Sequence, residues 1–271
     1  MDLYFRGEKM ICLTGDVHHI INSKEQQICD KTEQELAITY TEIARKNGLK
    51  ITLFLTGKCA KDKEFIQTLQ NFENLEIGGH TYSAFRPTIL YKFMKKMSGK
   101  TYGPYFNQAL DISWTIKAFK KRGVDITSWR THAYASDANT VKILQEQGIK
   151  VISDIVKPNI EPKEENGVMI LPINVLPDHE HLYHGFRTKT VVTNFLKTGW
   201  TDSFTNKSFS GDQWLKQVKE QIRENEKQGI VSTLIVHPQC MYNLNKFSTF
   251  KQLCKTLKGY GTSNARDIIC D

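Results

Sequence analysis

Short apolar runs alternate with longer amphipathic segments along most of the chain, and this alternation restricts the possible folds more than any other feature. Seven runs are too short for helices and mostly rich in β-branched or aromatic residues, so we predict them to be strands. They cover 10–13, 50–55, 75–77, 126–129, 150–153, 168–173 and 230–236. Helical repeats of apolar residues cover 33–47, 62–72, 106–122, 136–148, 212–228 and 247–257. Repeated strand–helix units predict an α/β fold with a parallel sheet, and about seven units favour closure into a distorted (β/α) barrel.

The length and the charge of the chain set further limits. A chain of 271 residues fits one domain over 1–271. The net charge of +8 could attract an anionic partner, but the lysines form no long basic run. We therefore expect a solvated basic surface and no nucleic-acid partner.

The cysteines and the N-terminal segment predict the compartment. Six cysteines form no CxxC pair, which favours free thiols in a reducing compartment. The first ten residues lack the apolar core of a signal peptide, and no run approaches the ~20 apolar residues of a membrane span. We expect a cytoplasmic protein without a transmembrane segment, for which peripheral membrane contact stays open.

Polar side chains follow the predicted strands where each strand ends. Asp16, His18 and His19 follow the first strand, and all eight histidines lie at or after the end of a strand or in the loop behind it. In a (β/α) barrel these ends meet at one face. We therefore expect convergence of Asp16, His80, Arg130, Asp178 and His237 at one mouth.

Two interpretations of these side chains are open from the residues alone. A carboxylate beside imidazoles suits a divalent metal or a general base, whereas solvated histidines in a polar turn would have no such role. The densest ionisable cluster consists of Asp178, His179, His181 and His184. It could line a groove, hold a second metal or be a solvated loop, although alternate positions on an extended loop point in opposite directions.

The order of these motifs resembles the polysaccharide deacetylase (NodB-like) family, carbohydrate esterase family four. Thr14–His18 stands where that family has Thr-Phe-Asp-Asp-Gly or a Thr-Phe-Asp-x-Asp variant, and Gly79–Ala84 stands for its His-Ser/Thr segment. Arg130–Tyr134 corresponds to Arg-x-Pro-x-Gly, Pro177–His179 to a groove segment containing Asp, and Leu234–His237 to Leu-x-His. The resemblance covers residues 10 to about 258 and implies a barrel that removes acyl groups from sugars.

The resemblance also implies roles for individual residues. Asp16 would be the general base and a metal ligand, with His18 and His80 as further ligands of a divalent metal such as zinc. His237 would be the general acid, and Arg130 would pair with Asp16. The expected substrate contacts are His19, Tyr82, His132, Tyr134 and Asp178.

Two positions depart from the family pattern. The family's second Asp falls on Val17 and its second His on Ala84, and neither residue can bind a metal. His132, which replaces a proline of the pattern, could complete the ligand set. A site that has lost its metal is the competing interpretation.

We therefore expect a metal-dependent hydrolase that removes an N-acyl group, acetyl or formyl, from a sugar or glycoconjugate. One alternative is a catalytically degenerate carbohydrate-binding barrel. Another is a metal-independent hydrolase of C–N bonds in a small amide.

Overall fold

The computed structural model describes residues 10–19, 24–197 and 202–268. The N-terminal segment 1–9, in which we expected no signal peptide, lies outside the described residues. The strands are β1 (Met10–Val17), β2 (Ile51–Leu55), β3 (Leu75–Gly79), β4 (Ser128–Trp129), β5 (Val151–Ile152), β6 (Lys163–Glu165), β7 (Val168–Ile170), β8 (Ser232–Ile235) and β9 (Gly261–Thr262).

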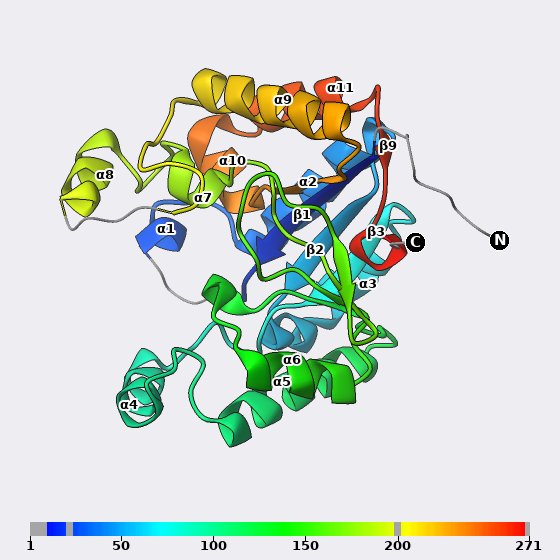
Figure 1. Ribbon diagram of the computed structural model, residues 1–271, viewed down its shortest axis with the longest axis vertical. Coiled ribbons are helices and arrows are strands. Elements are labelled where there is room, and N and C mark those ends of the chain that lie inside the picture. Colours follow the sequence, from blue (N-terminus) through cyan, green and yellow to red (C-terminus); the bar gives the residue numbers. More distant parts are fainter. Residues whose placement is uncertain (1–9, 20–23, 198–201, 269–271) are drawn as a thin grey trace.

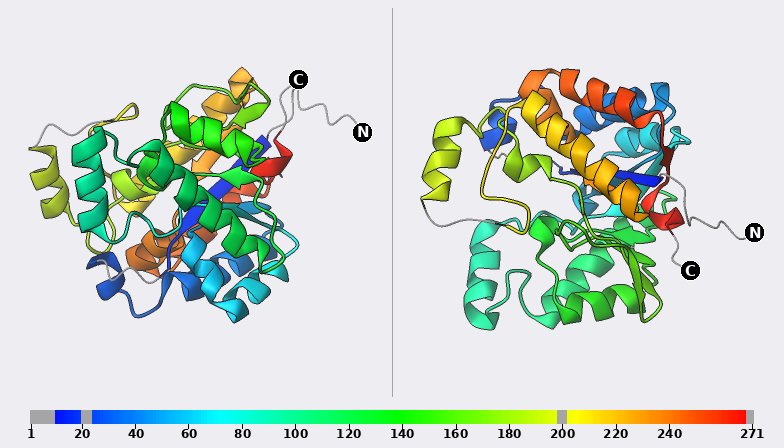
Figure 2. Two further views of the ribbon diagram at one scale, coloured as in Figure 1. Left: turned by 90° about the horizontal axis from the view of Figure 1, so that it is seen from below. Right: turned by 45° about the horizontal axis from the view of Figure 1, so that its top comes forward.

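The helices lie around this sheet (Figures 1 and 2). They are α1 (Lys24–Gln27), α2 (Glu33–Lys46), α3 (Lys63–Gln70), α4 (Thr88–Ser98), α5 (Tyr105–Lys120), α6 (Ala138–Glu146), α7 (Asp178–His181), α8 (Lys189–Leu196), α9 (Gly211–Gln228), α10 (Pro238–Asn245) and α11 (Ser248–Leu257). Short 3-10 turns occur at Gly57–Lys61, His132–Tyr134 and Ala265–Asp267.

The sheet has the strand order β6-β7-β5-β4-β3-β2-β1-β8, and β9 pairs with β1. Every pairing is parallel except that of β6 with β7. The segment after β7 approaches β8, because the amides of Asn174 and Val175 lie 3.2 and 3.3 Å from the Thr233 carbonyl oxygen. The sheet thus curls into an incomplete barrel, which confirms the predicted fold class.

Strand β1 forms the middle of the structure and is buried at every residue. It lies between β2 and β8, and its alternate side chains enter the core on both faces. Helix α2 packs nearby, and Thr32 caps it in a capping box with Glu35. Tyr40 of α2 stacks on Phe250 of α11 with ring centroids 3.9 Å apart. These contacts fix the end of β1, where Asp16 lies.

Several elements differ from the sequence prediction. Strand β1 continues through Val17, because β2 pairs with it as far as Leu55. Helix α4 falls in a segment predicted to be irregular and has no buried residue. Helix α10 begins at Pro238, where proline suits the first turn because its missing N–H has no intrahelical partner. Among the described residues, no helix is both long and apolar enough to cross a bilayer.

Candidate active site

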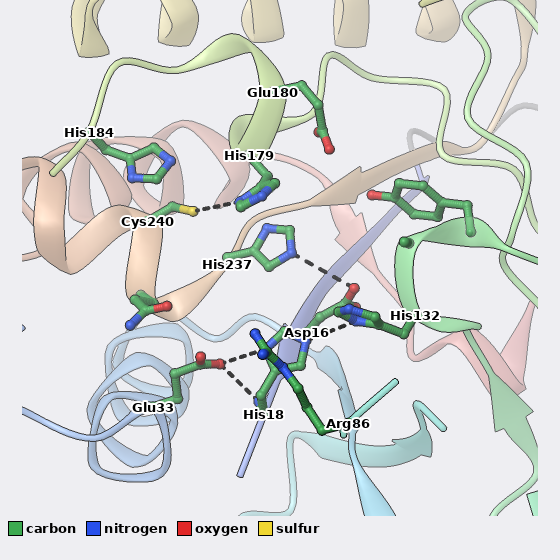
Figure 3. Close-up of a pocket in the computed structure, with 13 residues that line it drawn as sticks. Asp16, His18, Glu33, Arg86, His132, His179, Glu180, His184, His237 and Cys240 are labelled. Carbon is green, nitrogen blue, oxygen red and sulfur yellow. Dashed lines mark hydrogen bonds and ion pairs between the residues drawn. The ribbon is translucent and has the colours of Figure 1, made fainter. Parts of the chain in front are cut away.

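A cavity of about 310 Å³ opens where the carboxyl ends of the strands meet (Figure 3). Its walls come from segments that are far apart in the sequence, as the barrel geometry requires. It is lined by Asp16, His18, Glu33, Arg86, His132, Ala133, Tyr134, His179, Glu180, His184, His237, Gln239 and Cys240. The cavity is therefore rich in imidazole and carboxylate groups.

Asp16 is held at the floor of the cavity by a buried arginine. The guanidinium of Arg130 is fully buried, and its Nη1 donates to Asp16 Oδ1 at 3.0 Å. Arg130 also donates to the carbonyl and hydroxyl oxygens of Ser153 and lies over the Phe54 ring. Burial would raise the pKa of Asp16, but His80, Arg130 and His237 lower it below its ordinary value. Asp16 is consequently a carboxylate at neutral pH.

A second buried carboxylate orients His237. Asp178 accepts hydrogen bonds from the ring Nδ1 of His237 at 2.7 Å and from its backbone N–H at 2.6 Å. The other ring nitrogen, Nε2, lies 3.8 Å from Asp16 Oδ2. Burial would lower the pKa of His237, but Asp178 and Asp16 raise it to about 9. His237 therefore carries a proton at neutral pH and presents Nε2–H towards Asp16.

Three further histidines bring one ring nitrogen each to a common point. Nδ1 of His132 lies 3.2 Å from Nε2 of His18 and 3.1 Å from Nε2 of His80, and the three ligand atoms all lie within 4.8 Å of one another. His18 follows β1, His80 follows β3 and His132 follows β4. Three strand ends of the same sheet thus supply the cluster, with β2 lying between β1 and β3.

In two of these rings, the nitrogen that faces away from the cluster has its own hydrogen-bond partner. Nδ1 of His18 lies 2.9 Å from a carboxylate oxygen of Glu33, and Nδ1 of His80 lies 2.8 Å from the Arg130 carbonyl oxygen. In neutral rings these nitrogens carry the proton, so both Nε2 atoms present lone pairs to His132. Nδ1 of His132 carries at most one proton and cannot make a linear hydrogen bond to both. A cation among the three nitrogens would satisfy all of them.

The geometry and charge of this cluster fit a divalent metal. Nitrogens separated by 3.1 and 3.2 Å are close to the ~3.3 Å spacing in tetrahedral zinc with Zn–N bonds of about 2.0–2.1 Å. Burial lowers the pKa of His80 to about 4, so this ring is neutral and ready to bind. Burial also acts on His18, but Glu33 raises the pKa of that ring overall, so a proton competes with metal there. Glu33 and the Arg130 carbonyl are typical outer partners of metal-binding histidines.

The structure brings most of the expected site residues together. Asp16, His18, His132, Tyr134 and His237 line the cavity, with His80 and Arg130 buried behind them. The residues at the two departures from the family pattern, Val17 and Ala84, are buried and contribute no ligand. His132 supplies the third nitrogen of the three-histidine cluster, as the sequence allowed, whereas Asp16, expected to be a metal ligand, is bonded to Arg130 and lies outside this group.

Three residues expected to contact substrate do not line the cavity. Asp178 is fully buried and bonded to His237. The backbone N–H of His19 donates to the Thr56 hydroxyl, and the His19 ring nitrogen lies 3.1 Å from the same oxygen. Tyr82 lines a separate cavity and packs edge-on against Trp114. These placements follow from side-chain packing and hydrogen bonding, which motif order cannot predict.

Sequence reasoning missed several residues of the cavity. Glu33 was read only as the start of a helix, yet it orients His18. Arg86, Glu180 and Cys240 also border the cavity without having been singled out for it. No sequence signal pointed to Cys240, because its place in the first turn of α10 depends on a helix that was not predicted.

Comparison with family models and with curated proteins gives no match to this sequence. Solved structures do match. A protein from Mycobacterium smegmatis assigned as a polysaccharide deacetylase superposes with a TM-score of 0.64 at 12% identity, over 93% of this chain and 85% of the other. The chitin deacetylase of the fungal pathogen Colletotrichum lindemuthianum superposes with a TM-score of 0.52 at 12% identity, over 95% and 85%.

A third match is a pseudoenzyme of carbohydrate esterase family 4 from Bacillus anthracis. It superposes with a TM-score of 0.52 at 13% identity, over 96% of this chain and 64% of the other. The similarity at such identities concerns the fold. The chain is thus a structural relative of the polysaccharide deacetylases and family 4 carbohydrate esterases and shares their fold, as its motifs predicted.

Proposed function

We propose that this protein is a metal-dependent hydrolase that removes an N-acyl group from a sugar or glycoconjugate. The observation that carries the proposal is the position of Asp16. Its Oδ2 atom lies 3.8 Å from Nε2 of His237 and 3.8 Å from Nε2 of His80. An ionised carboxylate therefore stands between a protonated imidazole and a cluster suited to a metal.

The metal would be held by His18, His80 and His132. When bound, a divalent cation supplies Lewis acidity towards an acyl oxygen and towards water. Zinc suits three imidazoles in chemical terms. A three-histidine set leaves room for non-protein ligands, as a catalytic site needs.

The chain's own residues provide the proton transfers. Asp16 accepts a proton from the attacking water, and Arg130 holds that carboxylate ionised and in place. His237 donates its proton to the nitrogen of the leaving amine when the C–N bond breaks. Water adds across the amide bond, so the products are the free acid and the amine. Asp178 is a positioning residue, because it keeps Nδ1 of His237 engaged and Nε2 directed to Asp16.

The cavity wall supports a small polar substrate. A volume of about 310 Å³ lies at the lower end of ligand pockets and suits an acyl group with one sugar ring. Tyr134 offers a ring face, and Arg86 and Glu180 offer hydrogen bonds to hydroxyl groups. The names of the structural relatives, a polysaccharide deacetylase and a chitin deacetylase, agree with N-acetylated sugars as the first substrates to test.

The second candidate function is a carbohydrate-binding barrel without catalysis. It is favoured by the two family positions that carry Val17 and Ala84 and by the structural similarity to a pseudoenzyme. Sugar binding without acid release would identify this case. Acid release that persists after chelation would instead identify a metal-independent hydrolase.

The test is a release assay for acetate and formate. The purified chain is incubated with N-acyl amino sugars of one to four rings, with chelator or with added Zn²⁺ or Co²⁺. We expect metal-dependent release that falls at least 100-fold in Asp16→Asn and in His237→Gln. His19→Gln is the matched control, since His19 lies outside the cavity. Equal release by the parent and both variants would contradict the proposal.

A further inference from the structure

A second group of metal-binding side chains lies on the other side of His237 from the three-histidine cluster. It consists of His179, His184 and Cys240, whose ligand atoms all lie within 4.8 Å of one another. The Cys240 sulfur lies 3.6 Å from Nδ1 of His179. Figure 3 shows the His184 ring and the His179 ring on either side of the Cys240 sulfur, with the His237 ring next to that of His179. The group uses none of the residues assigned above to the reaction.

His184 has a buried ring that lacks hydrogen-bond partners. The residue is 5% exposed, and neither Nδ1 nor Nε2 has a partner in the described structure. A neutral imidazole has one N–H donor and one lone pair, and burying both unsatisfied is unfavourable. A buried group of this kind calls for a ligand or an ion. The ring lies in the cluster, so a cation there would engage one of its nitrogens.

The local fold explains why these three side chains meet. Asp178–His181 forms the short helix α7 in place of the extended loop expected, and His181 is engaged with the Lys207 carbonyl and Asp202. The chain then turns back, so that His184 approaches His179 with ring centroids 6.1 Å apart. Cys240 joins them from the first turn of α10.

We propose that His179, His184 and Cys240 form a second metal site that binds Zn²⁺. Two imidazoles and one thiolate are ligands that zinc favours. Binding replaces the S–H bond of Cys240 by a sulfur–zinc bond, and the proton passes to solvent. An alternative set of Asp178, His237 and Cys240 is also compact, but the first two already engage each other at 2.7 Å. The set that contains His184 is therefore the better candidate, because both ring nitrogens of His184 lack a hydrogen-bond partner.

The site would join the two segments that carry the proton-donating pair. His179 is adjacent to Asp178 in α7, and Cys240 lies three residues after His237. A metal bound to both segments would hold the 2.7 Å contact between Asp178 and His237. This consequence rests on the proposed function, whereas the metal site itself does not.

Cobalt provides a direct test, because a thiolate bound to Co²⁺ gives a sulfur-to-cobalt charge-transfer absorption in the near ultraviolet and imidazole does not. The metal-free full-length chain is titrated with Co²⁺. We expect two equivalents to bind, one of them with the sulfur absorption. His80→Ala should remove only the equivalent without sulfur absorption. Failure of the three-histidine site and failure of this site are thereby distinguished.

Variants of the second cluster complete the test. Cys240→Ser and His184→Gln should each lose the sulfur absorption and one bound cobalt, and Zn²⁺ should displace the wild-type band. His179→Gln changes a less buried residue, so it tests the site should the first two variants fail to fold. Cys29→Ser is the matched thiol control and should keep both equivalents. Absence of sulfur absorption in the wild type, or its persistence in Cys240→Ser, would overturn the proposal.

Discussion

Replacing Asp178 by asparagine should lower the pKa of His237 while preserving the shape of the site. The carboxylate now accepts from both Nδ1 and the backbone N–H of His237. In the variant, the single amide oxygen can serve the backbone N–H, which leaves the amide NH₂ facing Nδ1. That group donates a proton instead of accepting one, so it favours the neutral ring with its proton on Nε2.

The size of the effect follows from the folded-state pKa. The carboxylates of Asp178 and Asp16, acting against burial, raise the pKa of His237 from 6.5 to about 9. Such a rise corresponds to about 3 kcal/mol of preference for the protonated ring in the folded state. We expect the variant's pKa to fall by at least one unit, because Asp178 is the nearer carboxylate.

The sign of the pH dependence follows from the same linkage. A pKa raised on folding contributes stability that is fully present below about pH 6.5 and is lost as the pH rises through about 9. The wild type should therefore lose about 2–3 kcal/mol between these limits through this one group, and Asp178→Asn should lose clearly less.

Two assays measure these quantities on metal-free protein. NMR titration of the imidazole C–H resonances gives the pKa, with His237→Gln to assign the resonance. Urea unfolding across pH 6 to 9.5 gives the stability difference, for which His237→Gln is also the matched control. A His237 pKa that stays near 9 in Asp178→Asn would refute the assignment of Asp178 as the orienting group.

Three further predictions concern the metal, the fold and the limits of the site. Glu33→Gln should weaken zinc binding by about 10–100-fold in a chelator competition, because it alters the group that orients His18. Gly15→Ala should destabilise the chain by about 1–3 kcal/mol in urea unfolding, because the new Cβ would lie 2.6 Å from the Val236 carbonyl oxygen; an unchanged midpoint would contradict this packing. His19→Gln should leave zinc affinity and acyl release within about twofold, since its ring bonds to Thr56; a large loss would return His19 to the site.

The barrel could be predicted from the sequence because its strands are buried on both faces. Such strands appear as continuous apolar runs, as in 51–55 and 230–236, and the helices between them show regular repeats. Helix α4 was missed although Ile89, Phe93 and Met97 recur at helical spacing, and in the structure these side chains face solvent, with Ile89 84% exposed and Phe93 60% exposed. Helix α10 was missed because the His237-Pro238 pair after the strand was interpreted only as the end of that strand, and not as the start of a helix.

The sequence was enough to predict which residues lie at the mouth of the barrel, but not which side chains contact one another there. Barrel geometry places Asp16, His80 and His237 at one mouth, and this needs only strand order. The partner of each side chain depends on rotamers and on distant segments. Asp178 was expected to face substrate, yet the approach of the 174–175 segment to β8 places it beneath His237. Likewise, Glu33 could not be linked to His18 before α2 was placed beside β1.

The most direct test of the three-histidine metal site is an anomalous difference map from zinc-loaded crystals, collected on both sides of the zinc absorption edge. We predict a peak bonded to Nε2 of His18, Nε2 of His80 and Nδ1 of His132, at about 2.0–2.1 Å from each nitrogen. A map from fully loaded protein without a peak among these three nitrogens would contradict the account.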